Sequence, residues 1–273
     1  MRTLRYSIVD VFAETALEGN PLAVFTGGDG LSDALMQALA RETNLSETTF
    51  LQRAEGDGTA RLRIFTPARE LPFAGHPIIG SAWVIARSTP IHTIGFETAM
   101  GVIPVEIERD GGTLIGARMT QPEPLIGPAE VDVEALGAAL GTPLVGEPVR
   151  AANGLQHLLC PVADVSAAKP DYSRLATYAA DTVYIWAPPD GDELRTRMFS
   201  PLDDTFEDPA TGSAAGALGV HLLKTGVIQP GRIVMRQGVE IHRPSRIEVD
   251  VAPDEPPRVG GSCVVVARGE FQL

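Results

Sequence analysis

An internal near-repeat constrains the fold of this chain more than any other feature of its 273 residues. One segment begins with Arg63-Ile64-Phe65-Thr66-Pro67 and continues through Gly75 into a run of small and apolar residues. The other begins with Arg197-Met198-Phe199-Ser200-Pro201 and continues through Gly212 into a similar run. The two arginines lie 134 positions apart and the two glycines 137. An offset of about half the chain predicts two similar domains, because the repeats of a solenoid are much shorter.

Each copy follows the same order: a strand-like run, an acidic turn, a glycine and a helix rich in small residues. Apolar residues at helical spacing predict a further helix over 32–43, with Ser32 as its N-cap, and another over 132–141. The Pro- and Gly-rich stretch 120–128 is the predicted linker. We therefore expect two strand-rich domains, residues 1–120 and 121–273, with final strands that could return to the first. Each domain is expected to surround a central helix, with the active site in the cleft between them.

Composition excludes several classes of function. A net charge of −13 argues against a nucleic-acid partner, and no stretch approaches the roughly 20 apolar residues that cross a bilayer. The N-terminus lacks the apolar core of a signal peptide, so the cytoplasm is the expected location. Cys160 and Cys263 lie in apolar runs and are predicted to be buried thiols, neither a disulfide framework nor zinc ligands. The only lysines, Lys169 and Lys224, lie in a turn and near a helix end, which argues against a Schiff base with pyridoxal phosphate. No cofactor or metal is expected.

Four motifs, in order along nearly the whole chain, resemble the signature segments of the PhzF-like family. They are Gly19-Asn20-Pro21-Leu22, Leu45-Ser46-Glu47-Thr48, Phe73-Ala74-Gly75-His76-Pro77 and Asp208-Pro209-Ala210-Thr211-Gly212-Ser213. The tail from Gln237-Gly238 to Ser245 resembles the closing segment of the family. Each motif alone is a weak signal, but four in the family's order make a specific one.

The resemblance implies a diaminopimelate epimerase-like α+β fold, with a strongly curved sheet around a central helix in each domain, and a homodimer. The family includes an isomerase of phenazine biosynthesis, in which a glutamate moves the proton; that glutamate corresponds to Glu47. The other matching positions, expected to bind or lie beside the substrate, are Ser46, Gly75, His76, Asp208, Gly212 and Ser213.

The residues themselves suit such a site. Gly75 and Gly212 each open a predicted helix, where unpaired N–H groups and the helix dipole favour an anion such as a substrate carboxylate. His76 and Asp208 could hold polar groups of the substrate, and either could be a second acid or base. Each residue also has a purely structural interpretation. Glu47 could be a solvated carboxylate in a turn, His76 a helix cap and Asp208 a turn-forming residue.

The residues before the two glycines separate this chain from a racemase of the same fold. Diaminopimelate epimerase has a catalytic cysteine at each place, and here those places hold Ala74 and Thr211. Racemisation by two thiols is therefore not available, and the resemblance assigns the proton transfer to Glu47. Three functions stay open: a proton-shifting isomerase of a small carboxylated substrate such as trans-2,3-dihydro-3-hydroxyanthranilate, an isomerase or epimerase of another small acid, and a non-catalytic binding or interaction scaffold.

Overall fold

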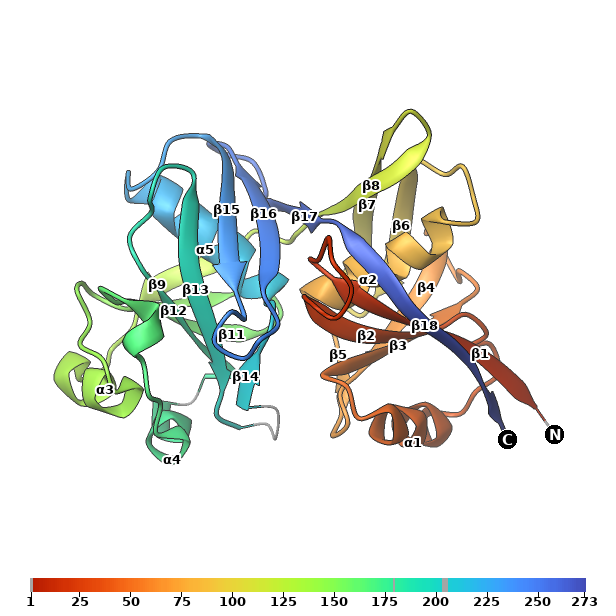
Figure 1. Ribbon diagram of the computed structural model, residues 1–273, viewed down its shortest axis with the longest axis horizontal. Coiled ribbons are helices and arrows are strands. Elements are labelled where there is room, and N and C mark those ends of the chain that lie inside the picture. Colours follow the sequence, from red (N-terminus) through yellow and green to blue (C-terminus); the bar gives the residue numbers. More distant parts are fainter. Residues whose placement is uncertain (1, 179, 203–205) are drawn as a thin grey trace. The chain divides into compact units, whose positions relative to one another are not determined.

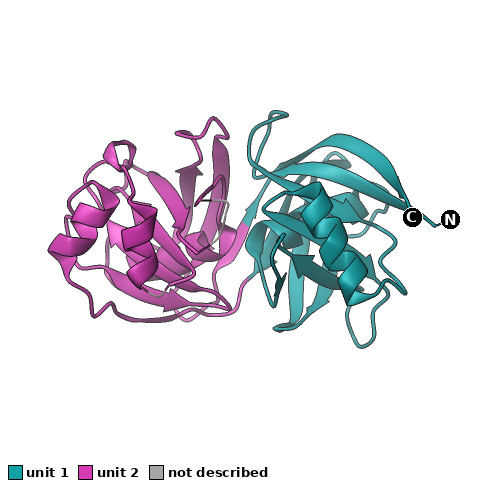
Figure 2. Cartoon of the chain, turned by 90° about the horizontal axis from the view of Figure 1, so that it is seen from below, with its two compact units in different colours: residues 1–120, 260–273 teal, residues 121–259 magenta. Residues whose placement is uncertain are grey.

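The chain forms two compact units, which Figure 2 colours separately. The computed structural model describes residues 2–178, 180–202 and 206–273. Residues 1–120 and 260–273 make up the first unit, and residues 121–259 the second. The final strand therefore lies with the first unit rather than the second. Within the described residues, no helix is long and apolar enough to cross a membrane.

The first unit surrounds the buried helix α2 with strands. In chain order its elements are β1 (Thr3–Val11), β2 (Asn20–Phe25), α1 (Asp33–Thr43), β3 (Glu47–Gln52), β4 (Ala60–Phe65), β5 (Glu70–Leu71), α2 (Gly75–Ala86), β6 (Thr93–Thr98), β7 (Gly101–Asp110), β8 (Thr113–Thr120) and β18 (Cys263–Gln272). Helix α2 contacts β1, β2, β3, β7 and β8 (Figure 1). A small residue permits this approach, because a Cβ at Gly80 would come within 2.6 Å of Leu22 and 2.7 Å of Val11. Ser32 caps α1 as predicted, accepting a hydrogen bond from the Leu35 N–H.

The second unit is built around α5. Its elements are β9 (Leu125–Pro128), α3 (Val133–Leu140), β10 (Val149–Ala152), β11 (Gln156–Pro161), η1 (Val165–Ala167), α4 (Tyr172–Leu175), η2 (Ala176–Tyr178), β12 (Thr182–Trp186), β13 (Glu193–Ser200), β14 (Phe206–Asp208), α5 (Gly212–Lys224), β15 (Gly231–Gln237) and β16 (Ser245–Val251), and β17 (Arg258–Gly261) leads back to the first unit. Helix α5 lies beside β16 (Figure 1). The predicted linker over 120–128 is wrong in its second half, because residues 125–128 form a strand paired with β10.

The strand ladders repeat between the units. Strand β2 pairs in parallel with β3, as β11 does with β12. The next strands, β4 and β13, pair antiparallel to β3 and β12, and each then pairs in parallel with the strand after the buried helix, β6 or β15. The repeat predicted from the sequence is therefore a repeat of hydrogen-bonding pattern.

An arginine clip explains why Arg63 and Arg197 begin the two sequence copies. The Arg63 guanidinium donates to both carboxylate oxygens of Glu70 at 2.6 Å and lies 5.2 Å from the centre of the Phe65 ring. The guanidinium of Arg197 donates to both oxygens of Glu207 at 2.8 Å and lies 5.0 Å from the Phe199 ring. In both units the clip ties β4 or β13 to the following short strand.

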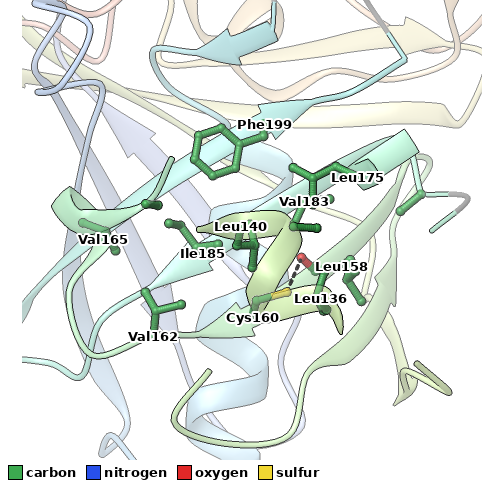
Figure 3. Packing of buried hydrophobic residues seen from close by; sticks show 13 residues of the cluster. Leu136, Leu140, Leu158, Cys160, Val162, Val165, Leu175, Val183, Ile185 and Phe199 are labelled. Atoms are coloured by element: carbon green, nitrogen blue, oxygen red, sulfur yellow. Dashed lines mark hydrogen bonds between the residues drawn. The ribbon is translucent and has the colours of Figure 1, made fainter. Parts of the chain in front are cut away.

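A core of buried hydrophobic side chains stabilises the second unit (Figure 3). Leu136 and Leu140 of α3 pack there with residues of β11, β12 and β13, including Phe199. Cys160 belongs to this core, and burial raises the pKa of its thiol well above the ordinary value. The thiol of Cys263 is also buried, with a raised pKa for the same reason. Both cysteines are buried structural residues, as predicted.

Candidate functional site

Glu47 is the first residue of β3, and its position follows from the end of α1. That helix ends at Asn44, which adopts a left-handed conformation with φ of 50°, and a short bend then leads into the strand. The Glu47 side chain is mostly buried, with 16% exposed, and its Oε2 lies 3.3 Å from Nε2 of His76. The structure thus brings together the predicted proton-transfer residue and the predicted histidine.

His76 is the second residue of α2 and is buried. Its Nδ1 lies 3.1 Å from Nδ2 of Asn20. An amide nitrogen only donates, so Nδ1 accepts and the ring proton belongs on Nε2, the atom that faces Glu47. Burial lowers the pKa of His76 to about 3. The imidazole is therefore a neutral N–H donor beside a carboxylate.

Asn20 lies in the first of the four motifs, but no role was predicted for it, and the structure places it beside His76. It begins β2, opposite Val11 of β1. The preceding Gly19 has a φ of +68°, and a side chain there would collide with the carbonyl oxygen of Val11. This glycine lets the chain turn tightly into β2, which brings the Asn20 amide to His76. The signal in the sequence was the Gly-Asn-Pro segment itself.

Gly75 and Ser46 adjoin this pair in the sequence. Gly75 is the first residue of α2 and is buried, and the N-cap before it, Ala74, has no side chain that could accept from the helix. The first turn of α2 therefore presents backbone N–H groups that Ala74 does not cap, the arrangement that suits an anion. Ser46 is half-buried in the bend before Glu47.

The second unit holds Asp208, the last residue of β14, which is 8% exposed. Its Oδ2 accepts a hydrogen bond of 2.7 Å from the Thr211 hydroxyl. The Thr211 side chain makes no cap to α5, because its hydroxyl is directed to Asp208 instead. Gln237 at the end of β15 is buried and donates to the Asp208 carbonyl oxygen at 2.8 Å. Neither Thr211 nor Gln237 was predicted as a site residue.

Gly212 and Ser213 are the first two residues of α5, and both are buried. Side-chain amides hold their carbonyl groups: Gln121 donates to the Gly212 oxygen at 2.8 Å, and Asn153 donates to the Ser213 oxygen at 2.9 Å. The first turn of α5 is thereby fixed from the side, and its N–H groups are available to an anion in the same way as those of α2.

A buried histidine supports this turn. His157 Nε2 lies 3.2 Å from the Asn153 Oδ1, and His157 Nδ1 lies 2.7 Å from the Thr182 hydroxyl. Burial lowers the pKa of His157 to about 4, against a smaller opposing effect of Asp181. His157 is thus a fully buried core residue. No group of three or more potential metal ligands occurs among the described residues.

The cluster of Asn20, Glu47 and His76 in the first unit is chemically suited to proton transfer. A glutamate is a titratable base, and the neutral imidazole N–H beside it can orient that carboxylate without competing for its proton. The cluster around Asp208 and the start of α5 in the second unit offers a buried carboxylate as a hydrogen-bond acceptor and a helix start that suits an anion.

Comparison with known proteins identifies the relatives of this chain. The model of a family described as phenazine biosynthesis-like protein matches residues 9–269. Over 277 residues, 98% of this chain and 99% of the relative, the chain is 43% identical to the trans-2,3-dihydro-3-hydroxyanthranilate isomerase of Pseudomonas chlororaphis. A structure described as a predicted epimerase from Pseudomonas aeruginosa is 34% identical, with a TM-score of 0.87 over 99% of both chains. A hydroxyproline epimerase from Agrobacterium vitis is 14% identical, with a TM-score of 0.74 over 98% of this chain and 92% of that one. The predicted epimerase-like α+β fold is confirmed.

Proposed function

This chain belongs to the phenazine biosynthesis-like protein family, and we propose that it isomerises trans-2,3-dihydro-3-hydroxyanthranilate with Glu47 as its proton-transfer residue. Its close relatives are named isomerases, and the chain is a small-molecule isomerase. The observation that carries the proposal is the Glu47–His76 pair, with 3.3 Å between Oε2 and Nε2. A carboxylate beside a neutral histidine can take and return one proton without a change in the charge of its neighbour.

The reaction is a proton shift within one molecule. The Glu47 carboxylate accepts the proton from C3 of the substrate, and the electron pair of that C–H bond moves into the adjacent unsaturated system. Glu47 then returns the proton to C1, which leaves an enol that tautomerises to the ketone. The substrate and the product therefore have the same atoms. His76 Nε2–H orients the carboxylate in both halves of the cycle, since the low pKa of the ring keeps it neutral.

The remaining predicted residues have binding roles in this proposal. Gly75 in the first unit, and Gly212 and Ser213 in the second, each offer a backbone N–H group at a helix start, which suits an anionic group of the substrate. Asp208 accepts from the amino or hydroxyl group, and Ser46 lies beside the substrate. Asp208→Asn and Ser213→Pro are expected to raise KM, because the first removes an anionic acceptor and the second a backbone donor. A KM unchanged in both variants would contradict these roles.

A second candidate is an isomerase or epimerase of another small acid. It is favoured by the similarity to a structure described as a predicted epimerase. Against stereoinversion by two thiols stand Ala74 and Thr211, the residues that precede the two helices. We extend the proposal to a reaction without a cofactor, in the cytoplasm, by a homodimer. Light scattering checks the last point, with twice the chain mass of 28.9 kDa as the expected result.

The test is a proton-NMR turnover assay with trans-2,3-dihydro-3-hydroxyanthranilate in deuterated buffer. Wild type is compared with Glu47→Gln, which keeps the shape of the side chain and removes the base. Glu42→Gln is the matched control, because Glu42 is an exposed glutamate at the end of α1. We expect turnover by wild type and the control, and none by Glu47→Gln. Turnover in Glu47→Gln would contradict the mechanism, and no turnover by wild type would direct the search to other small acids.

A further inference from the structure

The Gln237 side chain has only one possible orientation. Its Oε1 lies 3.2 Å from the Thr211 backbone nitrogen, which can only donate, and its Nε2 lies 2.8 Å from the Asp208 carbonyl oxygen, which can only accept. Exchanging the amide oxygen and nitrogen would place donor against donor and acceptor against acceptor. The partners therefore fix the amide.

This orientation sets the direction of the next hydrogen bond. Nε2 of Gln237 also lies 2.9 Å from the Thr211 hydroxyl oxygen, and its second hydrogen is donated there. The Thr211 hydroxyl therefore uses its own proton for Asp208 Oδ2, at 2.7 Å. The chain of donors runs in one direction, from amide to hydroxyl to carboxylate, and such directed chains strengthen each bond in a dry surrounding. All three residues are buried, with 0%, 7% and 8% exposed from Gln237 to Asp208.

Gly238 allows this close approach of β15 to the Asp-Pro-Ala-Thr turn. Its φ is +76°, and a Cβ there would lie 2.6 Å from the Pro209 carbonyl oxygen and would collide with that of Arg243. Only glycine adopts this positive φ readily and leaves room for the two carbonyl groups. The Gln-Gly step at the end of β15 is thus explained by its contact with the Asp208 segment.

We propose that Thr211 and Gln237 are positioning residues, which orient the Asp208 carboxylate for a hydrogen-bond donor of the substrate. Thr211 occupies one oxygen of that carboxylate, so the carboxylate cannot rotate without losing a charge-assisted hydrogen bond. The place that holds a thiol in a two-cysteine epimerase here holds a hydroxyl directed to a neighbouring carboxylate. The inference rests on the proposed function in one respect, the role of Asp208 in binding.

Two variants of Thr211 separate the effect of its hydroxyl group from the effect of its side-chain volume. Thr211→Val keeps the volume and removes the donor, whereas Thr211→Ser keeps the donor. We expect kcat/KM to fall about 10- to 100-fold in Thr211→Val, mainly through KM, and to change less than about 3-fold in Thr211→Ser. In the background Asp208→Ala, Thr211→Val should cause no further loss, because Thr211 acts through Asp208. If Thr211→Val does not fold, Thr211→Ala replaces it.

Crystal structures of the two variants without substrate make the test independent of the reaction. We expect the Asp208 carboxylate to rotate in Thr211→Val and to keep its place in Thr211→Ser. An unmoved carboxylate in Thr211→Val, or a full additional loss in the double variant, would overturn the proposal. Failure of wild type to convert the substrate would count against the proposed function alone, since the carboxylate position is measured without turnover.

Discussion

The starts of β3 and β12 occupy the same place in the two units and carry different chemistry. Leu22 faces Glu47 across the parallel ladder of the first unit, and His157 faces Thr182 across that of the second. Glu47 in the first unit is therefore the structural equivalent of Thr182 in the second. One is an ionisable group with 16% of its side chain exposed, and the other is a buried hydroxyl.

Each position is joined to a histidine and an asparagine. In the first unit the contacts run from Asn20 to His76 to Glu47, and in the second from Asn153 to His157 to Thr182. The first series ends on a group that can exchange a proton. The second contains no carboxylate and instead holds the Ser213 carbonyl through Asn153. The repeat thus provides one framework that carries an ionisable group in one unit and a hydrogen-bonded helix start in the other.

The strongest test of this comparison removes the functional group from each of the two equivalent side chains, Glu47 and Thr182. Glu47→Gln should reduce kcat by about 10³-fold or more, because it removes the only proton acceptor the mechanism uses. Thr182→Val should keep kcat within about 10-fold of wild type and lower the free energy of unfolding by about 1–3 kcal/mol, since it takes a hydrogen-bond partner from a buried imidazole. NMR turnover and urea unfolding measure the two effects. Equal losses of kcat would show that the units do not differ in this way.

The pH dependence of stability tests the two buried imidazoles. Burial lowers the pKa of His76 to about 3 and that of His157 to about 4, from an ordinary value of 6.5. Between pH 6.5 and about 4 the unfolded chain binds more protons than the folded chain, so the free energy of unfolding falls as the pH falls. Above pH 6.5 these groups contribute their full stability. We expect a loss on the order of a few kcal/mol between pH 7 and pH 4.

Urea unfolding at several pH values checks this expectation. The variant His157→Gln keeps an amide able to hydrogen-bond and removes one of the two titrating rings, so its stability should depend less steeply on pH than that of wild type. An unchanged slope in this variant would mean that His157 does not contribute to the loss.

The sequence predicted most of the fold, for physical reasons, and it marked both members of the Glu47–His76 pair that the structure brings together. The repeated Arg-x-Phe strand and the glycine that opens each helix are local patterns, so the two-unit architecture, Gly75 and Gly212 could be found without a structure. Glu47 and His76 were marked by motifs. The strand β9 was missed because its residues are rich in proline and glycine, and its partner β10 lies about 20 positions further on.

The amide side chains that hydrogen-bond to the predicted site residues could not be predicted in the same way. Asn20, Gln121, Asn153 and Gln237 are neutral amides, and their roles depend on contacts with distant segments of the chain. An amide gives no pattern of charge or periodicity that reveals its partner. Only the fold brings Gln237 to Thr211, 26 positions away.

A smaller effect is expected from the two asparagines. Asn20→Ala removes the donor that fixes the His76 tautomer, so the ring proton can move to Nδ1, away from Glu47. We expect kcat to fall about 10- to 100-fold. Asn153→Ala should instead raise KM, because it loosens the turn that carries Ser213. Michaelis kinetics of both variants distinguish these outcomes, and a rise in KM alone for Asn20→Ala would contradict the assignment.

The smallest expected difference lies in the arginine clips. Glu70 is 42% exposed, and Arg63 keeps a second carboxylate, Asp33, at 2.7 Å, whereas Glu207 is only 10% exposed beside an almost buried Arg197. Glu70→Gln should therefore cost less than about 1 kcal/mol of the free energy of unfolding, and Glu207→Gln about 2 kcal/mol or more. Urea unfolding of the two variants gives the comparison directly. Equal costs would mean that burial does not distinguish the clips.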